Sequence, residues 1–309
     1  MPEIVISEFM DEAAIREAFA GRDVLYDPQL VDDAARLHDA VRNARALIVR
    51  NRTQVRGSLL DAAVKLEVVG RLGVGLDNID VAACAARGVA VYPASGANDL
   101  AVAEYVITAA LVLLRRAWFA TGRVTAGEWP RTALMGREIA GKRLGLVGYG
   151  SIARVTAGMA RGLGMSVAAC DPLLPADHPA WAGTQQQSLP ELLGASDVVS
   201  LHVPLTETTR NMLDAGALAL MKRDAILINA ARGGVVDETA LCEALRGGRL
   251  GGAALDVFER EPLAAGSPLA GAPNLVLTPH IAGVTQDSNQ RVSSMIAERV
   301  AAFLAARTA

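Results

Sequence analysis

The sequence predicts an α/β protein built from two doubly wound parallel-sheet domains, with a binding cleft between them. Short, continuous apolar runs alternate with helical segments along its 309 residues, a pattern typical of parallel strands covered by helices on both faces. There are too many such runs for one compact sheet. Hydrophobic residues make up 51% and charged residues 20% of the chain, as expected for a globular protein.

The N-terminal part contains four predicted strands, "EIVISEF", "DVLYD", "ALIVRN" and "LEVVGRLG". Ala- and charge-rich helical stretches such as residues 30–44 lie between them. The pattern breaks at "YPASGAN", around Gly96, and a long helix is predicted from about residue 100 to 117. We therefore expect the first domain to include residues 1–97.

Six further strands are predicted, "RLGLVGYG", "SVAACD", "DVVSLHV", "DAILINAAR", "GAALDV" and "NLVLTP". A second break falls near Gly283, and a last helix covers residues 288–305. We expect this helix to return to the N-terminal domain. Residues 1–97 and 284–309 would then form a substrate domain, with a cofactor domain, residues 98–283, inserted between them.

Charge and composition exclude several classes of function. The net charge of −3 gives no electrostatic footprint for nucleic acid or an anionic membrane. The longest apolar stretch, within "EYVITAALVLLRRAW", is roughly half the length of a membrane span. Three scattered cysteines, Cys84, Cys170 and Cys242, form no metal motif and predict free thiols. Without such a motif, we expect no bound metal. The N-terminus has no basic region typical of a signal peptide, so we expect a cytoplasmic protein.

A strand that enters Gly148-x-Gly150-x-x-Ala153 and continues into a helix is typical of dinucleotide binding. Gly148 permits a tight turn, and Gly150 lets a pyrophosphate approach the main chain. The N–H groups of Ser151 and Ile152 would face that pyrophosphate at the helix N-terminus. By contrast, "GREIAGKR" at residues 136–143 only resembles a phosphate-binding loop, because it lacks the Ser or Thr and precedes a strand.

Asp171 ends the next strand, about 20 residues further on, where the motif places the acid that binds ribose hydroxyls. This carboxylate would repel a 2′-phosphate. The residues that follow, Pro172, Leu173 and Leu174, supply no cation to neutralise one. The sequence therefore predicts NAD as the cofactor and disfavours NADP.

Four polar residues follow strands of the cofactor domain, where open α/β sheets bind ligands. They are Arg232, Asp256, Glu261 and His280. Arg presents a two-pronged donor to a carboxylate, and His exchanges protons near neutral pH. Together with NAD, they indicate hydride transfer at a carbon that carries an oxygen and adjoins a carboxylate. Among the other histidines, we expect His38 to have no functional role and His178 to be solvated in a polar loop, and His202 either lines the cofactor pocket or is structural.

The chain resembles the D-isomer-specific 2-hydroxyacid dehydrogenase family. The resemblance rests on ordered motifs along nearly the whole chain: "GRLGVGLDNID", "NDLAVAEYVI", "GKRLGLVGYGSIA", "LHVPLTETT", "INAARGGVVDE", "ALDVFEREP" and "TPHIAG". It implies that Arg232 binds the substrate carboxylate, that His280 is the general acid/base and that Glu261 orients His280. It also implies that Asp256 contacts the nicotinamide carboxamide. Further residues implied near the nicotinamide or substrate are Ala230, Ala231, Ile281, Ala282, Gly283, Val74 and Gly75. Many relatives carry Gly at the position of Ala153.

Distal substrate contacts are expected from the N-terminal domain, where Arg50 and Asn51 end a strand and Asn98 opens the long helix. Arg71 ends a neighbouring strand. An Arg at this place suits a second anionic group, so we expect a small polar or dianionic 2-hydroxy acid. The candidates are glycerate/hydroxypyruvate, sulfolactate, malate-like acids and 3-phosphoglycerate. Alternatively, Arg50 pairs with a local acid or lies along the domain surface.

The segment after the long helix carries Trp118 and Trp129, two of the three tryptophans of an aromatic-poor chain. In the family this region wraps against a partner subunit, so the resemblance implies a homodimer; packing within one chain is the alternative. A non-enzymatic, NAD-sensing corepressor of the same fold is the alternative function. Oxidation of NADH with small 2-keto acids distinguishes the two functions.

Overall fold

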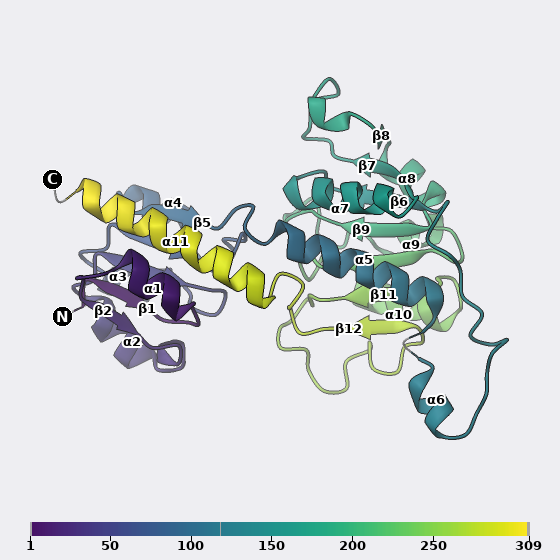
Figure 1. The fold of residues 1–309 in the computed structure, drawn as a ribbon, viewed down its shortest axis with the longest axis horizontal. Helices are drawn as coiled ribbons and strands as arrows, with labels where there is room; N and C mark the ends of the chain where they lie inside the picture. The colour runs from purple at the N-terminus through teal and green to yellow at the C-terminus, as the bar shows by residue number, and fades with distance from the viewer. Residues whose placement is uncertain (1, 118, 308–309) are drawn as a thin grey trace. The chain divides into compact units, whose positions relative to one another are not determined.

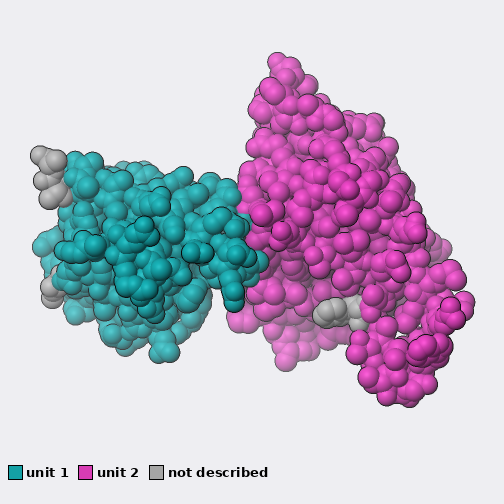
Figure 2. Space-filling model, viewed as in Figure 1, with its two compact units in different colours: residues 1–98, 284–309 teal, residues 99–283 magenta. Residues whose placement is uncertain are grey.

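The computed structural model describes residues 2–117 and 119–307. The chain divides into two compact units, unit 1 with residues 1–98 and 284–309 and unit 2 with residues 99–283 (Figure 2). The first boundary expected from the sequence falls one residue earlier, and the second coincides with this division. Trp118 lies outside the described residues.

Unit 1 contains a five-stranded, fully parallel sheet in the order β2-β1-β3-β4-β5. This is the order of flavodoxin-like folds. Its strands are β1 (Ile4–Ile6), β2 (Val24–Tyr26), β3 (Ala46–Val49), β4 (Val68–Arg71) and β5 (Ala90–Pro93). The first four are the predicted strands. The fifth strand, β5, was not predicted from the sequence; its four residues are only half-buried at the sheet edge.

Helices cover both faces of this sheet (Figure 1). Apolar residues of α1 (Glu12–Ala18) and α11 (Gln286–Ala306) pack in one core. Those of α2 (Ala34–Val41), α3 (Gly57–Ala62) and α4 (Val81–Ala86) pack in another, while η1 (Leu30–Asp32) precedes α2. Ile296 and Val300 of α11 are fully buried with Val68 of β4. Unit 1 is therefore built from two distant chain segments.

Unit 2 contains a seven-stranded parallel sheet in the order β12-β11-β10-β9-β6-β7-β8. Its strands are β6 (Arg143–Val147), β7 (Ser166–Cys170), β8 (Gln185–Gln186), β9 (Val198–Leu201), β10 (Ile226–Asn229), β11 (Gly252–Leu255) and β12 (Leu275–Leu277). Only β8 was not predicted, because it consists of two exposed glutamines. The strand order changes direction between β6 and β9: β6, β7 and β8 follow one another towards one edge of the sheet, and β9 to β12 towards the other. In this Rossmann-type order, ligands bind outside the carboxyl ends of the strands near that reversal.

The two faces of this sheet also carry helices (Figure 1). Residues of α5 (Asp99–Arg115) and α7 (Ser151–Gly162) pack in one core, and residues of α8 (Leu189–Ala195), α9 (Ala215–Leu220) and α10 (Glu238–Arg246) pack in the other. Two short elements, α6 (Thr121–Thr125) and η2 (Pro179–Trp181), complete the unit. Among the described residues, no helix is both long and apolar enough to cross a membrane.

Candidate active site

The glycine turn joins β6 to α7 in the geometry that the motif predicts. Gly148 has a φ of +86°, and a Cβ at this position would lie 2.6 Å from the carbonyl oxygen of His202, so a larger residue would be strained and crowded. A Cβ on Gly150 would meet no atom within 4 Å, and no side chain caps the N-terminus of α7. Open space in front of uncapped N–H groups fits a dinucleotide pyrophosphate. Ala153 is fully buried and packs in the core with α5.

The carboxylate of Asp171 lies against this turn. Its Oδ2 accepts a hydrogen bond from the Tyr149 N–H at 2.8 Å, and its Oδ1 accepts one from the Leu173 N–H at 3.0 Å. A pocket of about 400 Å³ opens beside it, lined by Cys170, Asp171, Pro172, Gln186, Gln187, Ser188 and Glu191. Two of these residues are acidic and none is basic. The pocket therefore suits uncharged ribose hydroxyls better than a phosphate.

Aromatic packing anchors the turn from behind, which sequence reasoning did not anticipate. The ring of Tyr149 is 3% exposed and stacks on Trp181, with ring centroids 5.2 Å apart. The Tyr149 hydroxyl lies 2.5 Å from the Thr184 hydroxyl. The excursion between β7 and β8 thus supports the middle residue of the turn. Neither Trp181 nor Thr184 belongs to a motif, so only tertiary contacts reveal them.

His280 and Glu261 are hydrogen-bonded to each other. Nδ1 of His280 lies 2.8 Å from Oε2 of Glu261, while Oε1 of Glu261 accepts the Phe258 N–H at 3.1 Å. The carboxylate is therefore fixed at both oxygens. Because Nδ1 is engaged, Nε2 is the ring nitrogen left for a substrate, and the His280 side chain is 41% exposed. His280 also has a φ of +59°, a conformation unusual for a residue other than Gly.

Asp256 holds the main chain around His280. Its carbonyl oxygen accepts the His280 N–H at 2.8 Å. Its carboxylate oxygens accept the N–H groups of Ile281 at 2.8 Å and Ala282 at 2.7 Å. The hydroxyl of Thr278 donates to Oδ1 at 2.6 Å. Asp256 is 1% exposed, so this geometry gives the carboxylate a role in the loop; its expected contact with the nicotinamide carboxamide stays a prediction.

Arg232 follows β10 in a loop organised by Asn229. The Asn229 side chain accepts the Ala231 N–H at 3.1 Å and donates to the Arg232 carbonyl at 2.9 Å. Nη1 of Arg232 donates to the Ala231 carbonyl at 2.6 Å. A Cβ on Gly233 would lie 1.7 Å from the carbonyl oxygen of Phe258, so the Arg232 loop is packed directly against the segment leading to Glu261. Asn229 is buried and was not identified from the sequence.

The other three histidines have local partners. Burial lowers the pKa of His202 to about 4, so its ring is neutral at pH 7, with Nε2 3.0 Å from the Ser200 hydroxyl. His178 accepts the Ala180 N–H at the start of η2. His38 lies 3.1 Å from the Ser58 hydroxyl in unit 1. None of these contacts joins a histidine to a carboxylate.

Arg50 follows β3 in unit 1, and its side chain is held in place. It donates to the Asn289 side chain of α11 and lies 5.6 Å above the ring of Phe9. Burial lowers the pKa of Arg50, against the opposing charge of Glu8. The side chain is only partly exposed, and its role in substrate binding stays a prediction. Arg52, in contrast, is exposed and forms an ion pair with Asp32.

A buried acid fixes the loop that carries Arg50 and Asn51. Glu8 is 4% exposed, and its carboxylate accepts the N–H groups of Arg50 at 2.9 Å, Thr53 at 3.0 Å and Arg52 at 3.2 Å. Asn78 donates to the carbonyls of Arg50 and Thr53. This ties the loop after β3 to the segment that follows Val74 and Gly75. Glu8 and Asn78 carry no motif and were not identified from the sequence.

Two further expected substrate residues have distinct surroundings. Arg71 ends β4, and its Nη1 donates to the Leu72 carbonyl at 3.0 Å. Oδ1 of Asn98 is buried and has no hydrogen-bond partner within residues 2–117 and 119–307. A buried acceptor without a partner is costly unless a ligand or water donates to it, which fits a residue that contacts a polar substrate.

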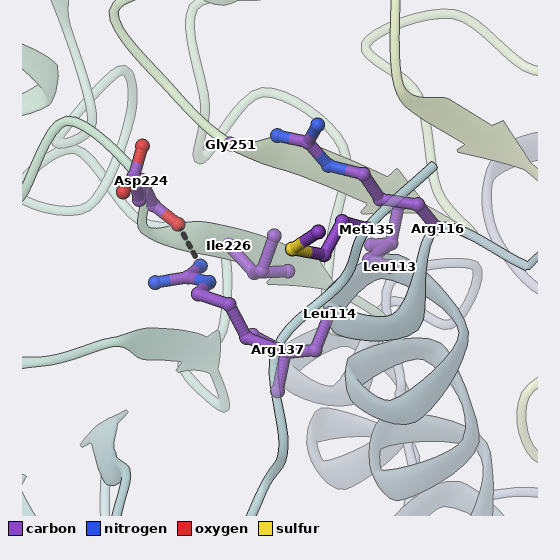
Figure 3. Close-up of a pocket in the computed structure, with 8 residues that line it drawn as sticks. All are labelled: Leu113, Leu114, Arg116, Met135, Arg137, Asp224, Ile226 and Gly251. Carbon is purple, nitrogen blue, oxygen red and sulfur yellow. Dashed lines mark hydrogen bonds between the residues drawn. The ribbon is translucent and has the colours of Figure 1, made fainter. Parts of the chain in front are cut away.

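A second pocket in unit 2, of about 200 Å³, involves none of the predicted site residues (Figure 3). Leu113, Leu114 and Arg116 line it at the end of α5, and Met135, Arg137, Asp224, Ile226 and Gly251 complete it. Arg137 donates to the Asp224 carbonyl. The pocket adjoins the start of β10, opposite the strand ends that carry Arg232. Among the described residues, no group of three His, Cys, Asp or Glu side chains is arranged to hold a metal ion.

The chain is similar to several known proteins in sequence and in structure. A family model described as "D-isomer specific 2-hydroxyacid dehydrogenase, NAD binding domain" matches residues 107–282. The chain is 54% identical to the (S)-sulfolactate dehydrogenase of Chromohalobacter salexigens, over 99% of this chain and 100% of that protein. It is 39% identical to the D-3-phosphoglycerate dehydrogenase of Archaeoglobus fulgidus over 82% of this chain, but spans about half, 48%, of that protein. A solved D-lactate dehydrogenase from Aquifex aeolicus, complexed with NAD and lactic acid, has a TM-score of 0.84 and 28% identity, with 98% of this chain and 96% of that chain covered.

Proposed function

Because the chain belongs to the D-isomer specific 2-hydroxyacid dehydrogenase family and is an NAD-dependent dehydrogenase, we propose that its substrate is a small 2-hydroxy acid with a second anionic group. The observation that carries this proposal is the fixed, partly buried guanidinium of Arg50. A relative that matches the whole chain is named for sulfolactate, a 2-hydroxy acid with a sulfonate. Sulfolactate and sulfopyruvate therefore lead the candidates, ahead of glycerate/hydroxypyruvate, malate-like acids and 3-phosphoglycerate.

Each residue near His280 has a proposed role in the reaction. Arg232 binds the carboxylate of the substrate. Nε2 of His280 takes the proton of the 2-hydroxyl group. Glu261 keeps Nδ1 engaged, so that Nε2 faces the substrate. Bound NAD would accept the hydride from C2, the carbon that carries this hydroxyl group. The products are the 2-keto acid, NADH and a proton held at first by His280; reduction runs the same steps in reverse.

The cofactor contacts are also proposed residue by residue. The main chain at Gly150, Ser151 and Ile152 would hold the pyrophosphate, and Asp171 the ribose hydroxyls. Support comes from the open space at Gly150 and from the pocket beside Asp171. Residues proposed to border the nicotinamide are Ala230, Ala231, Ile281, Ala282 and Gly283.

A reductase panel with NADH tests the substrate proposal. It contains sulfopyruvate, hydroxypyruvate, oxaloacetate, pyruvate and 2-ketoisocaproate. We expect a dianionic keto acid to have the highest kcat/KM, because a site with a partly buried cation rejects an apolar side chain that leaves the cation unpaired. The highest kcat/KM with 2-ketoisocaproate would contradict the proposal. The same assay measures the turnover that a non-enzymatic corepressor would lack.

We also propose that the chain forms a homodimer through the segment that follows α5. Support comes from Trp129 and Met135, which are 76% and 72% exposed. Contiguous exposed apolar patches mark surfaces that bind another protein, and we propose that these two side chains belong to one. Met135 also lines the pocket of Figure 3 together with Arg116 and Arg137. The occupant proposed for this surface is a second copy of the chain.

A further inference from the structure

A hydrogen-bonded chain of side chains links α5 to the loop that carries His280. The hydroxyl of Tyr105, on α5, lies 2.6 Å from Oγ1 of Thr278. Thr278 in turn donates to Oδ1 of Asp256 at 2.6 Å. A threonine hydroxyl has only one proton, and Thr278 gives it to the carboxylate. Tyr105 must therefore be the donor to Thr278, and the chain runs in one direction from Tyr105 to Asp256.

Beyond Asp256, this series of hydrogen bonds reaches the main chain around His280. Asp256 accepts hydrogen bonds from the N–H groups of Ile281 and Ala282 through its carboxylate, and from that of His280 through its carbonyl. The φ of +59° at His280 persists only where surrounding contacts fix it. The orientation of the Asp256 carboxylate therefore determines how firmly the His280 ring is presented.

Tyr105, at the start of this series of hydrogen bonds, is fixed as well. Tyr105 is half-buried and packs against the core formed by α5 and α7, which also includes Val276 of β12. Burial raises the pKa of Tyr105 to about 12. The phenol therefore keeps its proton, and remains a donor, throughout the pH range in which a dehydrogenase is assayed.

We propose that Tyr105 and Thr278 are positioning residues, which hold Asp256 and through it the His280 loop in the geometry needed for proton transfer. This inference rests on the proposed role of His280 as the acid/base. Neither residue contacts the reacting atoms. Their effect should therefore fall on the rate of the chemical step and spare the binding of the keto acid.

The test compares Tyr105→Phe, Thr278→Val and the double variant in the full chain, with sulfopyruvate or the best keto acid of the panel. We expect Tyr105→Phe to lower kcat about 10-fold, because small displacements of a catalytic group are costly, with the KM for the keto acid changed less than about twofold. Thr278→Val should lower kcat further, and Thr278→Ser should restore it. The double variant should match Thr278→Val, since Tyr105 acts only through Thr278.

A second measurement does not depend on turnover. Amide hydrogen exchange of residues 280–282, followed by mass spectrometry in protein without cofactor, should be faster in Tyr105→Phe than in the unchanged protein. Ser196→Ala is the matched control, because it removes another buried hydroxyl bond of unit 2, to the Leu192 carbonyl, far from this chain. It should leave both kcat and the exchange of residues 280–282 unchanged.

Three outcomes would overturn the inference: unchanged kcat and exchange in Tyr105→Phe, additive losses in the double variant, or losses in KM alone. Tyr105→Phe removes a single oxygen, so its result stands even where Thr278→Val folds poorly. His280→Asn separates this inference from the proposed function. If His280→Asn keeps full kcat, the proposed function fails; if it is inactive while the Tyr105 effects are absent, only the positioning role fails.

Discussion

Asp171 Oδ2 accepts a hydrogen bond from the Tyr149 N–H over 2.8 Å, so the acid that ends β7 is fixed against the glycine turn that ends β6. Its negative charge therefore stands at one defined position beside the pocket lined by Pro172 and Glu191. A mobile carboxylate could turn away from a phosphate, whereas this one is held by the turn itself. Cofactor preference should consequently depend on this single side chain.

Asp171→Ala combined with Pro172→Arg should shift the preference from NADH towards NADPH. The change removes a charge that repels the 2′-phosphate and adds one that attracts it, an effect of about 2 kcal/mol or more. The ratio of kcat/KM for the two cofactors measures the shift. Asp171→Asn is the control, since it removes the charge and keeps an oxygen for the Tyr149 N–H. Equal or better use of NADPH by the unchanged protein would contradict the predicted preference.

Arg50→Ala should lower kcat/KM for sulfopyruvate by an amount equivalent to about 2–5 kcal/mol, because it removes the partly buried partner of the second anionic group. Pyruvate should lose much less. Asn289→Ala should give a smaller loss in the same direction, since it releases the Arg50 guanidinium. Arg52→Ala is the matched control: its side chain is exposed and paired with Asp32, and the panel should not change. Equal losses for both keto acids would assign Arg50 a structural role.

His202 makes the stability of the protein depend on acid pH. Its pKa falls from 6.5 to about 4 on folding, so the unfolded chain binds more protons between these values. The free energy of unfolding should therefore fall as the pH drops from 6.5 towards 4, by at most about 3 kcal/mol from this group. Urea titrations at several pH values measure the slope. His202→Asn should flatten it.

Trp129→Ser together with Met135→Ser should weaken the proposed dimer, because both exposed apolar side chains would lose their contacts with the second copy. Light scattering across a dilution series gives the dissociation constant. A monomeric wild-type protein at micromolar concentration would contradict the proposed dimer. Leu173→Ser, which alters a 91% exposed side chain at another site, serves as the control.

Continuous apolar runs predicted the central strands well, because strands such as β3 and β9 are buried on both faces. The edge strand β8 was missed for the opposite reason, because both of its residues are exposed. The residues of the site likewise fall into a predicted group and a group that was missed. Residues carried by motifs, such as Arg232 and His280, could be named from the sequence. Supporting residues such as Glu8 and Tyr105 could not, since their partners Thr53 and Thr278 lie 45 and 173 residues away along the chain.

The way α11 completes unit 1 has a consequence for biosynthesis. Residues Ile4, Ile6 and Val68 form one core with Val292, Ile296 and Val300, yet all of unit 2 is translated between these two groups. The first 98 residues leave the ribosome with this apolar face uncovered. Unit 2, a single uninterrupted segment, has its whole core available sooner. The domain synthesised first is therefore the last to be finished, and the nascent chain must protect its early strands from aggregation until α11 arrives.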